Sequence, residues 1–485
     1  MYDEKLEERK ESFKRVKTSI VRKVEGYAHL LRKNSRESTI TRHRTKYITP
    51  ALTETPAPDL TNVTFNNLQT AQTKQQLHSA LTNLKLSIIQ DKLKVETEVF
   101  SLVLSLLNND CVSVQKEAAN VVSLLSTSSS ESVVLCFMQV DCVRVLISLI
   151  THKNPFIQVH ILHSLANMAS NGEKYRDLLI EEAIVDKLIT LFNAKYLESE
   201  IHDAAIFLIC NIFAAGPITS TYQIKALIPY VIETLWITRE ESLSDALWTL
   251  KYITENEGLA NNLGVINTDT IIKILIHAQS KSRQISNPAM EVFGNLSAGS
   301  DSKGELLTTC GAIDILKMML EDTEFESRKK EAAWILSNLV ACGPLVISEF
   351  LAVEGHLTVL KYMNAENIAI VQEMTWVISN CLMKGTNTHI QILLNDEVII
   401  NYLNLLFVND FNIKYLVLDT FNKLLDKLKE SEVKSNVIKQ VNETKITGKL
   451  EEIIYEANAR NANLATNILK VLADWCHIDC DMEEI

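Results

Sequence analysis

The chain has 485 residues, of which 47% are hydrophobic, and its formal net charge at pH 7 is −12. This length could form about three ordinary domains, and the apolar content is sufficient for a packed core throughout. The sequence has no run of about 18 uncharged apolar residues, and its first residues lack the apolar core of a secretory signal. We therefore expect a soluble intracellular protein.

Basic residues are concentrated at the amino-terminal end. Residues 1–46 contain 14 Lys/Arg and 7 Asp/Glu, a balance of +7, whereas the other residues have a balance of −19. Opposite charges of this size should attract the two parts to each other. Residues 47–72 contain Pro50, Pro56 and Pro58 among Thr, Asn and Gln, which is typical of a flexible linker. A tail on such a linker would act at roughly millimolar effective concentration on its neighbour.

A repeat of about 43 residues follows the linker. The phrase Trp-x-x-x-Asn occurs at Trp334 and Asn338 and again at Trp376 and Asn380. Steps of 41 to 44 residues lead back from Asn338 to the other marker positions, which are Asn295, Tyr252, Asn211, Asn167 and Leu124. A period in the forties without strand-like alternation predicts an all-α solenoid of stacked two- or three-helix units. We assign about ten such units to residues 73–474.

Apolar residues and glycines also recur at fixed distances from the marker positions. Val185 and Leu188 occupy the places in their repeat that Ile313 and Leu316 occupy in another, so the core pattern also repeats. Glycines follow the marker by four or five residues, where left-handed helix C-caps are expected, at Gly172, Gly216, Gly299, Gly343 and Gly385.

The Trp-x-x-x-Asn phrase indicates a binding surface for a basic peptide. Residues four apart lie on one face of a helix, so each phrase presents an indole beside an amide. An indole attracts lysine and arginine, and an amide can both donate to and accept from a peptide backbone. The alternative for any tryptophan is core packing, which we expect for Trp236 and Trp475 because they lack the phrase.

Catalytic and metal-binding motifs are missing from the sequence. It has no Gly-rich phosphate loop, no His-Glu-x-x-His and no nucleophile elbow. The nine cysteines lack framework spacing, so we expect reduced thiols. Cys476, His477 and Cys480 have no fourth ligand nearby and are a weak metal candidate. We expect neither an enzyme nor a cofactor.

With these residues the chain resembles importin alpha, the adaptor for nuclear localisation signals, over nearly its whole length. The basic segment resembles that family's importin-beta-binding domain at Arg22, Lys23, Leu31, Arg32, Lys33, Arg36, Arg42 and Arg44. The resemblance implies an armadillo-repeat right-handed superhelical solenoid with a flexible basic amino-terminal segment. It also implies that this segment folds back onto the adaptor's own groove until importin beta removes it.

The same resemblance implies two signal-binding sites in a concave groove. The carboxy-terminal site is well matched and consists of Glu291, Asn295, Asp301, Glu331, Trp334, Asn338, Glu373, Trp376 and Asn380. Its acids would pair with signal lysines, while the amides clamp the peptide backbone. Glu291 departs from the family, which usually has arginine there. Whether this acid engages a basic residue directly or only removes an internal pairing stays open.

The amino-terminal site is eroded in comparison with the family. Asn120 and Leu124 replace the first Trp and Asn, and Asn171 replaces an aspartate that grips a signal lysine. The remaining positions are His163, Asn167, Phe207, Asn211, Asp245, Trp248 and Tyr252. Weaker cation attraction by His and Phe favours signal binding at the other end.

Partners follow from the resemblance as well. They are importin beta, cargo proteins with basic signals, an export receptor with Ran-GTP at the carboxy-terminal end, and nucleoporins. The expected molecule is an autoinhibited monomer that shuttles between cytoplasm and nucleus and contacts neither nucleic acid nor membrane. Residues 475–485 would form an acidic tail. The alternative functions are an armadillo scaffold unrelated to nuclear import and, for the basic arm, a solvated or nucleic-acid-binding tail.

Overall fold

The computed structural model describes residues 67–483 apart from 90–96, 128–130, 217–220, 364–366, 430, 443 and 456–458. The described residues form α-helices and short 3-10 helices, and none of them is in a strand. The basic segment 1–46, with its predicted importin-beta-binding residues, lies outside the described residues.

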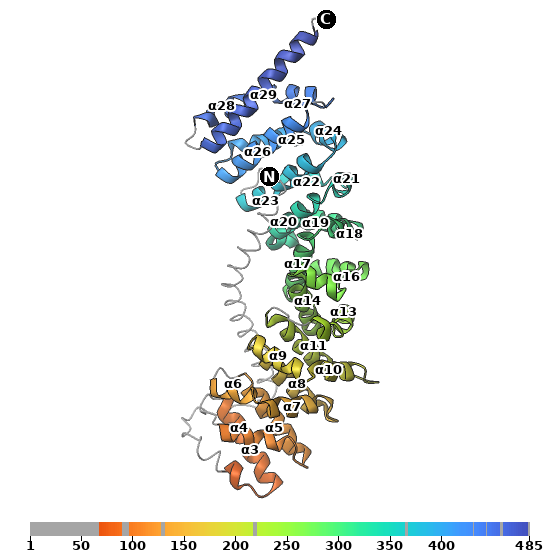
Figure 1. The fold of residues 1–485 in the computed structure, drawn as a ribbon, viewed down its shortest axis with the longest axis vertical. Coiled ribbons are helices and arrows are strands. Elements are labelled where there is room, and N and C mark those ends of the chain that lie inside the picture. Colours follow the sequence, from red (N-terminus) through yellow and green to blue (C-terminus); the bar gives the residue numbers. More distant parts are fainter. Residues whose placement is uncertain are drawn as a thin grey trace. The chain divides into compact units, whose positions relative to one another are not determined.

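One series of helices includes all those that carry the marker positions, from α5 to α23, and continues on either side of them. We call these the ladder helices: α3 (Lys74–Ile89), α5 (Val112–Leu125), α8 (Pro155–Ala169), α11 (Ser199–Ala214), α14 (Glu240–Thr254), α17 (Arg283–Ser297), α20 (Lys329–Val340), α23 (Ile368–Lys384), α26 (Phe411–Lys427) and α29 (Ala459–Glu483). Each ladder helix packs against the next one in the series (Figure 1). The markers therefore form a line across successive helices.

Two further helices precede most ladder helices. The first is α6 (Glu131–Phe137), α9 (Glu173–Glu181), α12 (Thr221–Lys225), α15 (Glu257–Leu263), α18 (Asp301–Thr309), α21 (Pro344–Ala352), α24 (Asn387–Asn395) or α27 (Lys434–Asn442). The second is α4 (Thr97–Leu106), α7 (Val140–Ser148), α10 (Ile184–Phe192), α13 (Ile228–Thr234), α16 (Thr268–Ala278), α19 (Ala312–Glu321), α22 (Gly355–Met363), α25 (Val398–Asn404) or α28 (Ile446–Ile454). The 3-10 helices are η1 (Leu149–Thr151), η2 (Thr323–Arg328) and η3 (Leu405–Phe407).

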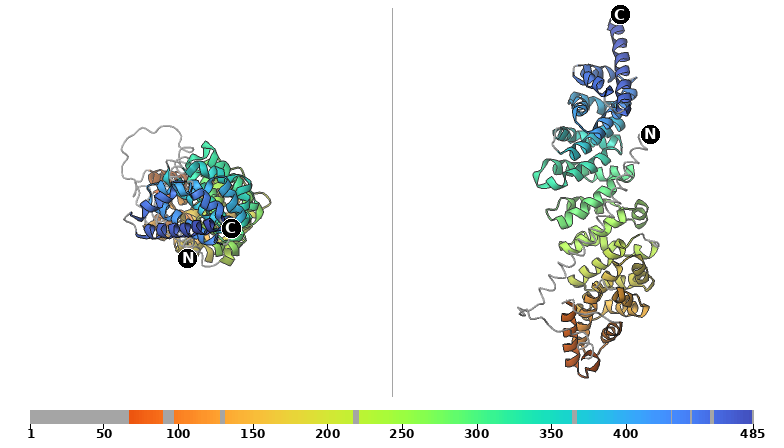
Figure 2. Two further views of the ribbon diagram at one scale, coloured as in Figure 1. Left: turned by 90° about the horizontal axis from the view of Figure 1, so that it is seen from above. Right: turned by 90° about the vertical axis from the view of Figure 1, so that its left-hand side faces the viewer.

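The second helices back the ladder helices. Contacts join α16 to α17, α19 to α20 and α22 to α23. In Figure 1 each of these second helices lies to the right of its ladder helix, and Figure 2 shows the same stacking of repeats from another side. No single helix in the described part is long and apolar enough to cross a bilayer; one pair bent by 75°, 387–395 with 398–407, meets the length and composition criteria together.

Local sequence explains where the helices begin and which face they bury. In α10, Ile184, Val185, Leu188 and Leu191 are buried, at the spacing of one helical face. The aligned pair Ile313 and Leu316 in α19 is buried too, which confirms the predicted core repeat. Side-chain caps start other helices: the Asn154 side chain accepts from Phe156 N before α8, and Asp410 accepts from Ile413 N before α26.

Helix α17 contains a proline that a neighbouring repeat accommodates. Pro288 has no N–H, so the carbonyl of Gln284, four residues earlier, lacks its helical donor. The hydroxyl of Ser244, on α14, donates to that carbonyl at 3.0 Å. A buried carbonyl without a partner would cost about 1–3 kcal/mol, so this bond allows proline inside a ladder helix.

Two predicted boundaries differ from the structure, one at each end of the described region. Residues 67–70 are helical and Leu68 is 2% exposed, so the packed region begins before the predicted end of the linker at 72. The predicted tail boundary at 475 falls inside α29, which continues to Glu483, and Trp475 packs into the core at 5% exposure. The Nζ of Lys434, the first residue of α27, lies 4.9 Å from the Trp475 ring centroid, so the last repeat extends past that point.

The glycine expectation was partly wrong. Gly172 and Gly343 have φ values of 127° and 129° with extended ψ, and they stand before the first residue of α9 and α21. This region is accessible essentially to glycine alone, but it is not the left-handed helix cap that was predicted. Gly385 has φ −69° and needs no special freedom. At Gly172 and Gly343, therefore, glycine is required by the sharp turn between two helices and not by a helix cap.

Candidate functional site

Except for Asp301, the residues of the predicted carboxy-terminal site lie on three consecutive ladder helices. Trp334 and Glu331 are half-buried on α20, and Trp376 and Glu373 are half-buried on α23. Glu291 and Asn295 are on α17, while Asp301 is exposed in the first turn of α18. The spacing of three residues places each glutamate one helical turn before its tryptophan. We use the name ladder face for the side of α8 to α23 that carries the residues of both predicted signal-binding sites.

The asparagines of this site are anchored to the preceding repeat. Asn295 Nδ2 donates to Thr254 Oγ1 at 3.2 Å and to the Lys251 carbonyl at 3.3 Å. Asn338 Nδ2 donates to Ser297 Oγ at 3.3 Å, and Asn380 Nδ2 donates to the Ser337 carbonyl at 2.7 Å. Each bond crosses from one ladder helix to the one before it. The amide orientation is thereby set by repeat stacking before any ligand arrives.

The hydroxyl partners were missed by sequence reasoning. Thr254 and Ser297 each lie two residues after a marker and 41 residues before the asparagine that they receive. Ser126 repeats this arrangement with Asn167, at 2.9 Å. A Ser or Thr at marker plus two is a visible signal, but it becomes meaningful only once the repeat-to-repeat contact is known.

A glycine supports the first tryptophan of the phrase. A Cβ atom on Gly294 would lie 2.6 Å from Cζ3 of Trp334. The indole therefore rests directly against the backbone of α17, beside Asn295. This contact fixes the ring across the repeat boundary and explains why a glycine is tolerated inside that helix despite its low helix propensity.

The amino-terminal positions also lie on consecutive ladder helices but make different contacts. His163 on α8 and Phe207 on α11 are half-buried, with their ring centroids 6.0 Å apart at 85°. Asn167 keeps the bond to the preceding repeat, whereas Asn211 Nδ2 donates to the Phe207 carbonyl of its own helix at 2.8 Å. The amides are thus present without indoles beside them.

The central repeat has its own arrangement on α14. Asp245, Trp248 and Tyr252 are half-buried, and the two aromatic rings are 6.3 Å apart. Lys251 precedes Tyr252, and its ammonium lies 4.7 Å from the Tyr252 ring centroid and 5.9 Å from that of Trp248. Neither contact of this lysine was anticipated from the sequence.

The expectation for Trp236 was wrong. This residue follows α13 and is 49% exposed, with the ammonium of Lys273 4.9 Å above its ring. It sits at the end of a second helix, away from the markers. Absence of the Trp-x-x-x-Asn phrase correctly separated Trp236 from the ladder but did not reveal whether the ring is buried.

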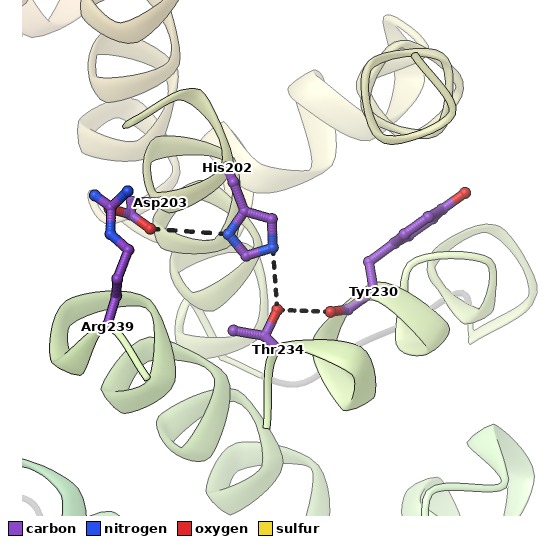
Figure 3. A network of polar contacts seen from close by, with 5 residues as sticks. All are labelled: His202, Asp203, Tyr230, Thr234 and Arg239. Atoms are coloured by element: carbon purple, nitrogen blue, oxygen red, sulfur yellow. Dashed lines mark hydrogen bonds and ion pairs between the residues drawn. The ribbon is translucent and has the colours of Figure 1, made fainter. Parts of the chain in front are cut away.

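A histidine network connects α11 to the next repeat (Figure 3). His202 Nε2 lies 3.4 Å from Thr234 Oγ1, its Nδ1 lies 3.8 Å from Asp203 Oδ1, and Asp203 also pairs with Arg239. The order of groups is that of a nucleophilic triad. However, Thr234 is fully buried and its hydroxyl donates to the Tyr230 carbonyl at 2.7 Å, so the network joins repeats rather than presenting a nucleophile.

Thiols and acids offer no metal centre among the described residues. No group of three or more His, Cys, Asp or Glu side chains there could hold a metal ion. The described cysteines are free thiols, and burial raises the pKa of Cys142 to about 12. The side chains of Cys476, His477 and Cys480 lie outside the described part.

Stacked helical units with a 43-residue period and a continuous ladder of long helices define an armadillo-repeat solenoid. A solved engineered protein aligns with 86% of this chain and 99% of its own, with a TM-score of 0.66 and 18% identity. No family model matches the chain. Importin subunit alpha-8 of Arabidopsis thaliana is 23% identical over 61% of this chain and 66% of its own length. Importin subunit alpha-1a of Oryza sativa subsp. japonica is 22% identical over 49% and 44%.

The chain is therefore an importin-alpha-like armadillo protein. The aligned regions span less than two thirds of the length of these curated relatives.

Proposed function

We propose that this protein is a nuclear import adaptor that binds the lysine- and arginine-rich localisation signals of cargo proteins on its ladder face. One observation carries the proposal: α20 and α23 each present a half-buried indole with a glutamate one turn before it and an anchored asparagine one turn after it. The likeness to importin alpha subunits supports it independently.

An extended basic peptide suits this surface chemically. Its lysine stems would lie against Trp334 and Trp376, with their ammonium groups directed to Glu331 or Glu373. A well-placed cation over an indole contributes roughly 0.5–2 kcal/mol, and a neutral hydrogen bond about 0.5–1.5 kcal/mol net. Affinity must therefore come from several repeats acting together.

The anchored amides are the backbone-binding groups in this proposal. A carboxamide has two donor hydrogens and one acceptor oxygen, so one side chain of this type can bond both to a neighbouring helix and to a peptide backbone. Asn295, Asn338 and Asn380 are held in one orientation by those bonds. Preorganised amides lose less entropy when a peptide binds, which favours affinity.

The remaining roles rest on the likeness to importin alpha. We propose that residues 1–46 bind importin beta and otherwise compete with cargo for the ladder face, because their charge balance is +7 while the rest of the chain has −19. An export receptor with Ran-GTP and nucleoporins complete the proposed partners. The protein then shuttles between cytoplasm and nucleus, uses no cofactor and has no catalytic activity.

The test is binding of a fluorescent lysine-rich signal peptide, measured by anisotropy with a variant lacking residues 1–46. We expect Trp334→Ala/Trp376→Ala to weaken binding by about tenfold or more, given the loss of two cation contacts. The matched control is Trp236→Ala, because that exposed indole lies off the ladder. Equal affinity in the ladder variant and the control would overturn the proposal.

A second comparison tests the competing segment. Deleting residues 1–46 should tighten peptide binding and abolish binding of importin beta. Because the attraction between the segment and the ladder face is electrostatic, the difference between the full chain and the deletion variant should shrink as salt concentration rises. Identical peptide affinity with and without the segment at low salt would sink the autoinhibition proposal.

A further inference from the structure

The glutamates of the ladder do not recur at its amino-terminal end. On α20 and α23 a glutamate stands seven residues before the marker, and we call this place the acidic position. It holds His160 on α8 and Ala204 on α11. On α5 it holds Glu117, but the Oε2 of this residue lies 3.0 Å from the Nζ of Lys85 on α3. The acidic positions of α5, α8 and α11 therefore offer a basic ligand no free carboxylate.

Aromatic rings occupy this part of the surface instead. Phe156, His160 and His163 follow one another at steps of four and three residues, so they share one face of α8. The ring centroids of Phe156 and His160 are 4.3 Å apart, and those of His163 and Phe207 are 6.0 Å apart. All four rings are half-buried, and we call them the ring cluster. Their exposed parts suit an aromatic ligand side chain, because aromatic pairs favour tilted and edge-to-face contacts of this kind.

A lysine stands over one end of the ring cluster. Lys116 is half-buried on α5, and its Nζ lies 5.7 Å from the ring centroid of Phe156. No carboxylate within the described part of the chain pairs with this ammonium. A partly shielded charge interacts more strongly with an opposite charge than a fully exposed one does. An anionic ligand group would therefore be attracted to Lys116, and a cationic one repelled.

We propose that the ring cluster and Lys116 form a docking surface for an acidic, aromatic segment of a partner protein. A carboxylate of the segment pairs with Lys116, and an aromatic side chain packs against His163 and Phe207. Charge complementarity selects this partner, because the surface presents an unpaired ammonium and lacks free acids at the acidic positions. The inference does not rest on the proposed function, since it assigns this end of the ladder a ligand opposite in charge to a localisation signal.

The spacing of the ladder helices predicts the spacing within the segment. Helix α5 packs against α8, and α8 packs against α11. Packed helices lie roughly 8–10 Å apart, and an extended chain advances about 3.4 Å per residue. Lys116 and Phe207 lie on opposite sides of α8, so the carboxylate and the aromatic side chain should be about three positions apart.

The test uses two labelled Gly/Ser peptides with a tryptophan. One has two glutamates that end three positions before the tryptophan, and the other has glutamines in their place. Binding to the full chain is measured by fluorescence anisotropy at low salt. We expect the glutamate peptide to bind about fivefold more tightly than the glutamine peptide. Lys116→Met keeps an unbranched stem over Phe156 and should remove this preference, whereas an unchanged preference in that variant would overturn the inference.

The ring cluster is tested by replacing the tryptophan of the glutamate peptide with alanine. This replacement should weaken binding to the unaltered chain about fivefold, and binding to His163→Ala/Phe207→Ala by less than about twofold. Equal losses in the two proteins would show that the aromatic side chain does not contact these rings.

Three controls separate Lys116 from other charges. Lys116→Arg retains a cation and should behave like the unaltered chain. Lys273→Met removes another lysine over an aromatic ring, that of Trp236, which is off the ladder, and should leave the preference unchanged. The basic segment 1–46 could itself attract glutamate, so the titrations are repeated without it. A preference that disappears with that segment but survives Lys116→Met would overturn the inference.

One segment of this chain has similar chemistry to the proposed ligand. Residues 47–66 contain Glu54 and Asp59 and no lysine or arginine. We expect variants lacking residues 1–46 and 1–66 to bind the glutamate peptide equally well. Binding that is about tenfold tighter without residues 47–66 would identify them as the occupant of the surface and contradict the assignment of a separate partner.

Discussion

The two ends of the ladder face share one hydrogen bond and differ in the side chains around it. Asn167 on α8 and Asn338 on α20 both donate to a serine 41 residues earlier, at 2.9 and 3.3 Å. Beside Asn338 stands Trp334, whereas beside Asn167 stands His163. The asparagine is therefore present at both ends, whereas the indole is present only at the carboxy-terminal end. Its first task is to hold adjacent repeats in register, and the tryptophans and glutamates are what make one end a binding site for basic peptides.

The largest expected difference between the ends is in ligand binding. Trp334→Ala/Trp376→Ala should reduce the affinity for a lysine-rich peptide by about thirtyfold, and His163→Ala/Phe207→Ala by less than about threefold. The reason is that imidazole and phenyl rings attract cations less than indole does. Isothermal titration of the two double variants checks this. A larger loss from the His163/Phe207 pair would place the ligand at the amino-terminal end.

Next in size is the effect of Gly294→Ala. The new Cβ would lie 2.6 Å from the indole of Trp334, so the ring must move, and overpacking of this kind costs about 1–3 kcal/mol of stability. Peptide affinity should fall with it. Gly448→Ala in α28 is the control, because nothing lies within 4 Å of its added methyl group. Thermal unfolding should show a lower Tm for the first variant only.

The shared asparagine bond should contribute equally at both ends. Asn167→Ala and Asn338→Ala should each lower the free energy of unfolding by about 1 kcal/mol, since each leaves a serine hydroxyl without its donor. Only Asn338→Ala should also weaken peptide binding. Urea denaturation and peptide titration of the same two proteins separate the roles. If both variants weakened binding alike, the two ends would be functionally equivalent.

The smallest expected effect is a pH dependence of stability from two histidines. Burial lowers the pKa of His389 on α24, with Lys427 nearby lowering it further, and burial lowers the pKa of His277 on α16. Both groups therefore contribute stability above their unfolded pKa of about 6.5, and that contribution is lost as pH falls through the lower folded values.

The Tm should accordingly decrease between pH 7.5 and 5.5. His389→Gln should reduce this decrease, because glutamine also suits the capping box that His389 forms with Thr386. His163→Gln serves as a control on a half-buried ladder residue. A pH profile unaffected by His389→Gln would show that its lowered pKa does not influence folding.

Much of the fold could be predicted because the apolar residues that face the core recur with the period of the repeat. Val185, Leu188, Ile313 and Leu316 are buried as their register required. The gathering of Trp334, Trp376, Glu331 and Glu373 on adjacent ladder helices follows from helical spacing within each repeat. These features depend on one helix or one period at a time, which a sequence displays directly.

Most of the features that were missed depend on contacts between repeats. Three of them join residues about 40 positions apart. Asn338 donates to Ser297, Trp334 packs against Gly294, and Ser244 donates to the carbonyl that Pro288 leaves without a helical donor. The contact of Trp236 with Lys273 likewise joins residues at the end of α13 and on α16 that are far apart in the sequence. Periodicity predicts which residues share a helical face, but not which atoms of two stacked repeats meet.

Photo-crosslinking gives the most direct test of where the ligand lies. A lysine-rich signal peptide with a diazirine group at each basic position in turn would be irradiated with the chain lacking residues 1–46, and the crosslinked residues identified by mass spectrometry. The account predicts crosslinks within α17, α20 and α23 around Trp334 and Trp376. Crosslinks confined to α5, α8 and α11, or to the second helices around Trp236, would contradict it.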